Sequence, residues 1–218
     1  MLTLNIETVP TERALAIPFP ADDYAHKVPE YAKEKDREER IAAWWLKTEA
    51  RWREDQEYSL NPLWGRVVAI GQAVDDQEPE VFLSEDEDLE AGNVSECFRE
   101  LAPTLITFNG LAFDLPFLRV RAAALGVNLS TSVPFSRLLA RYRTDAHFDV
   151  RAVITNWDNR VKGTLADCCH AFGITPPVGS GADVWPAYQR GDFDFIEQHC
   201  RSNVEATRAL YRRLAPYQ

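Results

Sequence analysis

The stretch Leu2-Thr-Leu-Asn-Ile-Glu-Thr-Val-Pro10 begins with alternating apolar and polar side chains, the pattern of a β-strand with one buried face. In such a strand Asn5 and Glu7 point to the same side, so two oxygen-bearing side chains lie together near one end. Oxygen ligands of this kind suit a hard divalent cation. A plain N-terminal strand with a polar outer face would show the same pattern, so the rest of the chain must decide between the two interpretations.

Two later segments add polar side chains next to expected elements. The segment Phe108-Asn-Gly-Leu-Ala-Phe-Asp-Leu-Pro116 follows a short apolar strand and contains Asn109 and Asp114. The segment His199-Cys-Arg-Ser-Asn203 places a histidine and an amide four residues apart, on one face of an expected helix.

These three segments, in this order, resemble the three motifs of the DEDD superfamily of 3'-to-5' exonucleases, which share a ribonuclease H-like fold. The resemblance is to the stand-alone group similar to the proofreading domain of family B DNA polymerases, and it spans almost the whole chain. It implies an α/β fold with a mixed sheet of about five strands and helices on both faces. We expect a single domain over residues 1–218, with a helical insertion around residues 21–60.

The resemblance also implies a site for two Mg²⁺ or Mn²⁺ ions, which would hydrolyse a phosphodiester bond at a 3' end. By position, the residues that correspond to the four metal ligands are Asn5, Glu7, Asp114 and Asn203. His199 stands where the family has a tyrosine that orients the attacking water, so His199 and Glu7 are the catalytic candidates. Asn109 is expected to shape the substrate groove.

Two ligand positions depart from the family, which has Asp where this chain has Asn5 and Asn203. An amide oxygen can coordinate Mg²⁺ but brings no charge, so the site loses two negative charges. We therefore expect weakened metal occupancy and attenuated or absent catalysis. Because both changes are isosteric and the neighbouring motif residues are intact, they fit either an inactivated copy of an active enzyme or a site kept for binding.

Two functional hypotheses follow. The first is a metal-dependent exonuclease lineage that acts on 3' ends of single-stranded DNA or RNA and is attenuated in this chain. The second is a pseudonuclease that grips nucleic acid or a protein partner without cutting it. The motifs do not discriminate between DNA and RNA, because no residue can be assigned to a 2'-hydroxyl.

The formal net charge of -10 argues against a general nucleic-acid coat protein, because phosphate affinity comes mainly from Lys and Arg. Positive charge is nevertheless concentrated between residues 119 and 162, where eight Lys and Arg stand against three Asp. Within this segment Arg137, Arg141 and Arg143 are candidate contacts for a phosphate backbone, although a solvated helix face would carry the same charges.

Hydrophobic residues make up 45% of the chain, enough for one buried α/β core. No stretch approaches the roughly 18 apolar residues of a membrane span, and no signal peptide is evident, so we expect a cytoplasmic protein with no membrane association. The four cysteines form no Cys-x-x-Cys pair and are expected to be reduced packing residues.

Periodicity predicts further strands at residues 63–74, 80–83 and 104–108, and helices at residues 31–58, 84–101, 113–125, 164–172 and 192–214. The first helix is expected to cover one side of the body. Its Trp44, Trp45 and Trp52 are expected in the core, although they could also stack on bases. Asp149 is expected to be a structural partner of an arginine, with a peripheral place near the metals as the alternative.

Overall fold

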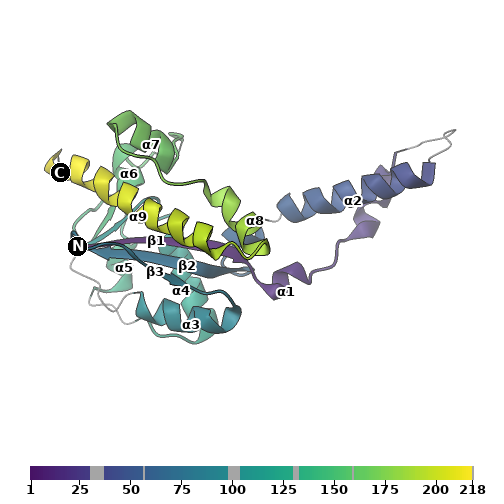
Figure 1. Ribbon diagram of the computed structural model, residues 1–218, viewed down its shortest axis with the longest axis horizontal. Helices are drawn as coiled ribbons and strands as arrows, with labels where there is room; N and C mark the ends of the chain where they lie inside the picture. The colour runs from purple at the N-terminus through teal and green to yellow at the C-terminus, as the bar shows by residue number, and fades with distance from the viewer. Residues whose placement is uncertain (30–36, 56, 98–103, 130–132, 159, 218) are drawn as a thin grey trace.

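A five-stranded sheet with the strand order β3-β2-β1-β4-β5 forms the centre of the molecule in the computed structural model (Figure 1). The structure describes residues 1–29, 37–55, 57–97, 104–129, 133–158 and 160–217. The strands are β1 (Leu2–Pro10), β2 (Gly65–Val74), β3 (Glu80–Leu83), β4 (Leu105–Thr107) and β5 (His147–Asp149). The sheet is therefore the mixed sheet of about five strands that the sequence predicts.

The central strand β1 is antiparallel to β2 and parallel to β4. Its alternation sends Leu4 and Ile6 into the core on one face, while Asn5 and Glu7 point to the other face. The pairing of β1 with β2 shifts register between Glu7 and Thr8. A local irregularity of this kind can re-aim a side chain.

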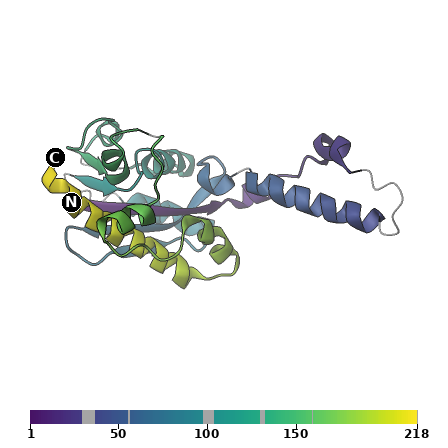
Figure 2. The same cartoon turned by 90° about the horizontal axis from the view of Figure 1, so that it is seen from above.

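Helices cover both faces of the sheet (Figures 1 and 2). One face carries α3 (Glu87–Glu96), α4 (Asp114–Leu125) and α5 (Phe135–Leu138). The other face carries α6 (Val150–Ile154), α7 (Leu165–Phe172), α8 (Val184–Gln189) and α9 (Phe193–Leu214). Within the described residues, no helix is both long enough and apolar enough to cross a membrane.

Helix α9 crosses the sheet next to β1 and β2 and begins at the N-cap Asp192, whose carboxylate accepts a hydrogen bond from Phe195 N. Its buried apolar positions include Ile196, Cys200 and Val204. This packing fixes the height and rotation of the helix, so His199 and Asn203 face the same side of the sheet as Glu7. All four cysteines are free and buried, as expected.

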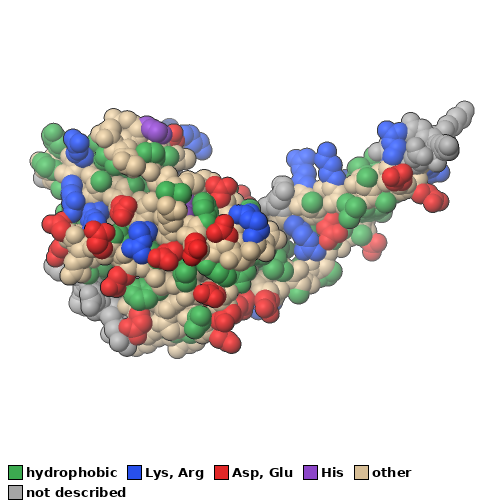
Figure 3. Space-filling view, viewed as in Figure 1, with side chains coloured by type: hydrophobic (Ala, Val, Ile, Leu, Met, Phe, Trp, Pro, Cys, Tyr) green, Lys and Arg blue, Asp and Glu red, His purple; other side chains and the backbone are tan. Residues whose placement is uncertain are grey.

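An arm leaves the end of β1 and returns to the start of β2. It contains α1 (Glu12–Leu15), the 3-10 helix η1 (Ala21–Lys27), α2 (Arg37–Asp55) and the 3-10 helix η2 (Tyr58–Leu60). Helix α2 projects away from the body instead of covering one side of it, so that expectation is wrong (Figures 1 and 2). On the face shown in Figure 3, Lys and Arg side chains line the upper edge of the arm.

The tryptophans of α2 lie outside the core, which corrects the second expectation for this helix. Trp44, Trp45 and Trp52 are each half-buried. Phe19 covers them locally, with its ring centroid 6.1 Å from that of Trp45 and 5.7 Å from that of Trp52. An apolar stripe on a helix must be covered, and here the neighbouring segment of the arm covers it instead of the sheet.

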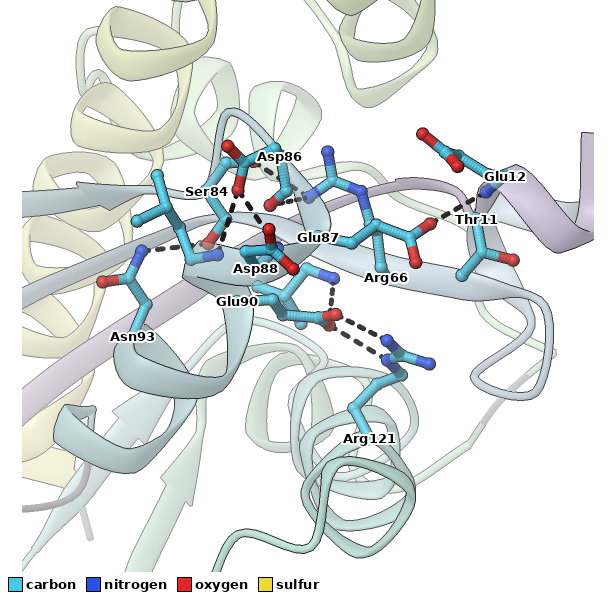
Figure 4. Close-up of polar contacts among 12 residues, drawn as sticks. Thr11, Glu12, Arg66, Ser84, Asp86, Glu87, Asp88, Glu90, Asn93 and Arg121 are labelled. Atoms are coloured by element: carbon cyan, nitrogen blue, oxygen red, sulfur yellow. Dashed lines mark hydrogen bonds and ion pairs between the residues drawn. The ribbon is translucent and has the colours of Figure 1, made fainter.

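Helix α3 differs from the predicted helix at residues 84–101. It begins after the N-cap Asp86, and the predicted residues 98–101 lie outside the described part of the chain. Leu89 on this helix is 50% exposed, whereas its neighbour Glu90 is fully buried. Glu90 accepts hydrogen bonds from Val67 N and from the Arg121 guanidinium, as Figure 4 shows.

Candidate active site

Glu7 is the centre of a polar cluster between β1 and α9. Its Oε1 accepts a hydrogen bond from Asn5 Nδ2 at 2.8 Å and another from Asn203 Nδ2 at 2.9 Å. His199 Nε2 lies 3.4 Å from the same oxygen. Burial raises the pKa of Glu7, while His199 and the two amides act in the opposite direction. Residues that are almost 200 positions apart in sequence therefore meet at one carboxylate oxygen, as the three motifs predict.

Asp114 is the first residue of α4 and lies beside the middle of β1, next to the Glu7 cluster. Its Oδ1 accepts a hydrogen bond from Ile6 N at 3.1 Å, and the residue is 4% exposed. Burial raises the pKa of Asp114 to about 8; the negative charges of Asp149 and Glu7 raise it further, and backbone hydrogen bonds oppose the rise. The carboxyl group therefore keeps its proton to a higher pH than an ordinary aspartate does.

His199 is held on both sides of its ring. Its Nδ1 lies 2.5 Å from the carbonyl oxygen of Val178, and its ring stacks on Phe195 with a centroid distance of 5.9 Å. A carbonyl can only accept, so in the neutral ring Nδ1 carries the proton and Nε2 offers a lone pair toward the cluster. Asn203 Nδ2 is 3.2 Å from Nε2, which places the second amide hydrogen on His199.

The segment that contacts His199 is fixed to α9 by a short relay. Val178 N donates to Ser202 Oγ, and Ser202 Oγ donates to the carbonyl oxygen of His199. Gly179 follows with φ +67, and a Cβ there would meet Phe195 Cζ at 2.7 Å, so only glycine fits. Neither Ser202 nor Gly179 has a sequence signal of its own, because the relay exists only once the loop and helix have packed.

Asp149 organises the second motif. Its Oδ1 accepts from Asn109 N at 3.0 Å and from Ala152 N at 3.1 Å, and its Oδ2 accepts from Leu111 N at 2.9 Å. The structural role expected for Asp149 is present, but the expected arginine partner is wrong, because backbone amides fill that place. Asp149 is also the N-cap of α6. Asp is a common N-cap residue, so its type is compatible with this role.

The motif residues line one cleft with a volume of about 480 Å³. The predicted site residues on its wall are Asn5, Glu7, Asp114, His199, Asn203 and Asn109. Arg151 also lines the cleft and brings a positive charge that the sequence interpretation had not assigned to the site. Phe108 and Phe113 add apolar wall, so the cleft combines a polar floor with aromatic sides.

Of the three predicted phosphate contacts, two lie away from the cleft and one lies beside it. Arg137 and Arg143 form ion pairs with Asp145, at 2.6 Å and 2.9 Å, and neither lines the cleft. The hydrogen bonds from Arg143 and then Arg137 lower the pKa of Asp145 to about 2. Asp145 precedes β5, whereas the cleft lies beyond the other end of that strand. Arg141 lies in a small hollow that shares Asn109 and Arg151 with the cleft.

The donor set does not fit a pair of Mg²⁺ or Mn²⁺ ions. Among the described residues, no three His, Cys, Asp or Glu side chains meet as a metal-binding group. Glu7 and Asp114 supply carboxylates, but Asn5 and Asn203 direct their N–H groups at Glu7. Turning the amides to offer their oxygens would remove both donors from Glu7 and would still leave the site two negative charges short.

The mixed five-stranded sheet with helices on both faces is a ribonuclease H-like fold, and the motif side chains gather beside the middle of its central strand. The chain belongs to the family described as predicted 3'-5' exonucleases related to the exonuclease domain of PolB, whose model matches residues 60–218. The matched span includes Asp114, His199 and Asn203, while β1 and most of the arm precede it.

Among solved structures, the family B DNA polymerase from the hyperthermophilic archaeon Pyrobaculum calidifontis is similar to this chain, with a TM-score of 0.60 and 18% sequence identity. The similarity covers 99% of this chain and 24% of the polymerase chain, so the protein spans about a quarter of the length of that polymerase. This likeness confirms the predicted fold. No match was found among curated proteins.

Proposed function

We propose that this chain is a 3'-to-5' exonuclease-family domain that binds the 3' end of a single-stranded nucleic acid in the cleft, with attenuated or no hydrolysis. The observation that carries the proposal is the pair of amide hydrogen bonds, from Asn5 and from Asn203, to one oxygen of Glu7. The family supplies the reaction class, and the amides supply the reason for attenuation.

The two amides give Glu7 hydrogen-bond donors at the place where a site with four acids would hold a divalent cation. With Asp at positions 5 and 203, three carboxylates would crowd together, and like charges at this distance demand a counter-charge. With Asn at both positions, neutral N–H donors satisfy Glu7 without any ion. A cation arriving in the cleft must therefore displace hydrogen bonds as well as find ligands, and metal affinity falls.

The cleft suits the end of a single strand. Arg151 places a guanidinium on the wall, where it can meet a phosphate, and the rings of Phe108 and Phe113 offer apolar faces to a base. His199 Nε2 already accepts the second amide hydrogen of Asn203, so a water molecule beside Glu7 must displace that hydrogen bond before His199 can act as a base. Binding needs only the first two features, which the substitutions at positions 5 and 203 leave in place.

The test is to restore the acids. The double change Asn5→Asp and Asn203→Asp should give tighter Mn²⁺ binding and shortening of a labelled single strand from its 3' end, and each single change should give less, because ligands of one cluster act as a unit. Asn128→Asp, which adds a charge at an exposed site, is the matched control and should gain nothing. Asp114→Ala in the restored background should abolish the gain, which excludes a contaminating nuclease.

The alternative function is a binding-only domain, and the same experiment separates the two. If the restored chain binds oligonucleotide and Mn²⁺ but releases no nucleotides, His199→Tyr is the next change, because the family has tyrosine at that position. A triple variant that still binds and never cuts would replace the exonuclease proposal with the binding-only function.

A further inference from the structure

A small hollow opens beside the cleft and shares two wall residues with it. Asn109 and Arg151 line both, and the hollow itself has a volume of about 50 Å³. Arg141, Tyr142 and Trp157 form its outer wall. A ligand in the cleft therefore lies next to this hollow.

The outer wall is an exposed aromatic surface. Tyr142 is 74% exposed, and its ring centroid lies 5.2 Å from that of Trp157, with 45° between the ring planes. A hollow of this volume is too small to enclose a nucleobase, but a flat base can lie across the open face of the Tyr142 ring. Base stacking on an aromatic ring works in this way and depends little on sequence.

Both aromatic residues have a left-handed backbone conformation. Tyr142 has φ +61 and Trp157 has φ +64. Bulky side chains rarely adopt these angles, because Cβ then crowds the following carbonyl group. Local strain of this kind is typical of functional sites. Asn or Gly would be less strained at either position. The presence of two aromatic residues despite this strain points to a role for their rings.

The charge of the hollow favours a phosphate. Arg141 is exposed, and among the described residues Arg151 makes two long hydrogen bonds, 3.3 Å to Asn109 Oδ1 and 3.3 Å to the carbonyl oxygen of Val161. The acid on the hollow wall is Asp149, whose two oxygens already accept three backbone N–H groups. An incoming phosphate would therefore find two guanidinium groups and one carboxylate, whose oxygens are directed at backbone N–H groups.

We infer that this hollow is a separate subsite for single-stranded nucleic acid, in which an upstream nucleotide stacks its base on Tyr142 and Trp157 and places its phosphate against Arg141 and Arg151. The inference rests on the proposed function, which puts the 3' end in the neighbouring cleft. In this arrangement the nucleic acid leaves the cleft past Arg151 and away from Glu7. The subsite therefore sets the direction in which the nucleic acid lies on the protein.

The experiment compares a labelled dinucleotide with a labelled octanucleotide, because only the longer strand reaches beyond the cleft. Tyr142→Asn and Trp157→Asn remove each ring while keeping a residue that tolerates the left-handed backbone. Each should weaken octanucleotide binding about tenfold, the loss expected for one stacked base, and leave dinucleotide binding unchanged. Tyr217→Asn, which removes an exposed ring from the C-terminal 3-10 helix η4 (Ala215–Tyr217), is the matched control.

A second pair of variants tests the phosphate contact independently of the rings. Arg141→Gln should reduce the salt dependence of octanucleotide binding by the amount that corresponds to about one phosphate contact. Arg143 is already paired with Asp145, so Arg143→Gln should leave the salt dependence unchanged. Urea denaturation of every variant confirms that it is folded, and the two Asn variants should be at least as stable as the parent chain.

The other outcomes are decisive as well. If the parent binds the octanucleotide and the Asn and Gln variants bind it equally well, the subsite is wrong and the proposed function stands. If the ring variants weaken both oligonucleotides alike, the rings act on the cleft itself and the separate subsite is wrong. If the parent binds neither oligonucleotide, the proposed function fails and the subsite fails with it.

Discussion

Glu7 and Glu90 are buried glutamates on opposite faces of the same sheet, and the fold holds them in different ways. Glu90 receives Arg121 Nε at 3.0 Å and Nη2 at 2.5 Å, together with Val67 N at 2.7 Å (Figure 4). Glu7 receives two neutral amides, and His199 lies nearby. The first acid has a cation built into the chain, whereas the second has only neutral donors and a histidine.

The difference separates a structural acid from a site acid. A bidentate arginine fixes charge and geometry permanently, which suits the join between α3 and α4. Neutral donors hold a carboxylate in place without cancelling its charge, and burial then raises the pKa of Glu7. Side-chain burial alone does not distinguish the two residues; the identity of their partners does.

Breaking the Glu90 pair should have the largest effect. Arg121→Leu leaves a buried carboxylate without its cation and should lower the free energy of unfolding by about 3–5 kcal/mol, measured by urea denaturation. Arg143→Gln removes an exposed arginine from its ion pair and should cost less than about 1 kcal/mol. Adding Glu90→Gln to Arg121→Leu should recover much of the loss; an unchanged loss would mean that the arginine acts through packing and not through charge.

Converting the Glu7 cluster to acids should have an intermediate effect that depends on metal. Without divalent cations, the double change Asn5→Asp and Asn203→Asp should lower the free energy of unfolding by about 1–3 kcal/mol, because two donors become like charges. Mn²⁺ at about a hundredfold excess over its dissociation constant should restore about 2.7 kcal/mol. Urea denaturation with a chelator measures the loss of stability, and denaturation with Mn²⁺ measures how much of it the metal restores. A parent chain stabilised by Mn²⁺ to the same extent would contradict the weakened metal site.

Asp114 extends the comparison to a buried acid held by the backbone N–H of Ile6, and its effect on stability depends on pH. Its pKa is about 8 in the folded chain against an ordinary value of 3.8, so the folded chain binds the proton more tightly. This stability is present below pH 3.8 and is lost as pH rises through 8, by at most about 1.4 kcal/mol per pH unit.

Asp114→Asn should remove that pH dependence, and urea denaturation between pH 5 and pH 9, a range chosen to cross the pKa, measures it. Asp22→Asn changes an exposed acid on the arm and should keep the slope of the parent. Equal slopes for the parent and Asp114→Asn would place the pH dependence on another group, with Glu7 the first to examine, since its pKa is raised as well.

The sequence predicts the sheet and the site better than the surface. The alternation in β1 and the compact run in β3 give strand bounds that the structure matches to the residue. The site residues converge because their motif spacing belongs to one fold. Short helices such as α6 escape prediction, because α6 begins only where the Asp149 side chain caps it, and that side chain is fixed by hydrogen bonds from the backbone N–H groups of Asn109 and Leu111.

The arm shows why hydrophobic periodicity predicts a helix but not which part of the protein that helix packs against. An apolar stripe on α2 predicts that something covers Trp45 and Trp52, but it does not say whether the sheet or Phe19 does so. Charge runs have the same limit. Arg137 and Arg143 stand close to Arg141 in sequence, yet Asp145 occupies the first two, and only the folded chain brings Arg141 beside the cleft.

The neck of the arm makes β1 and β2 a β-hairpin with an unusually long connection. Thr11 N and Oγ1 both donate to the carbonyl oxygen of Trp64, directly beyond the pair Pro10 and Gly65, so the chain leaves and re-enters at one point. Loop closure is forgiving of length, since each doubling costs only about 0.6 kcal/mol. The arm can therefore be shortened, exchanged or fused to another protein at this neck while the strand that carries Glu7 keeps its register. The neck is therefore a suitable site for inserting or removing protein segments.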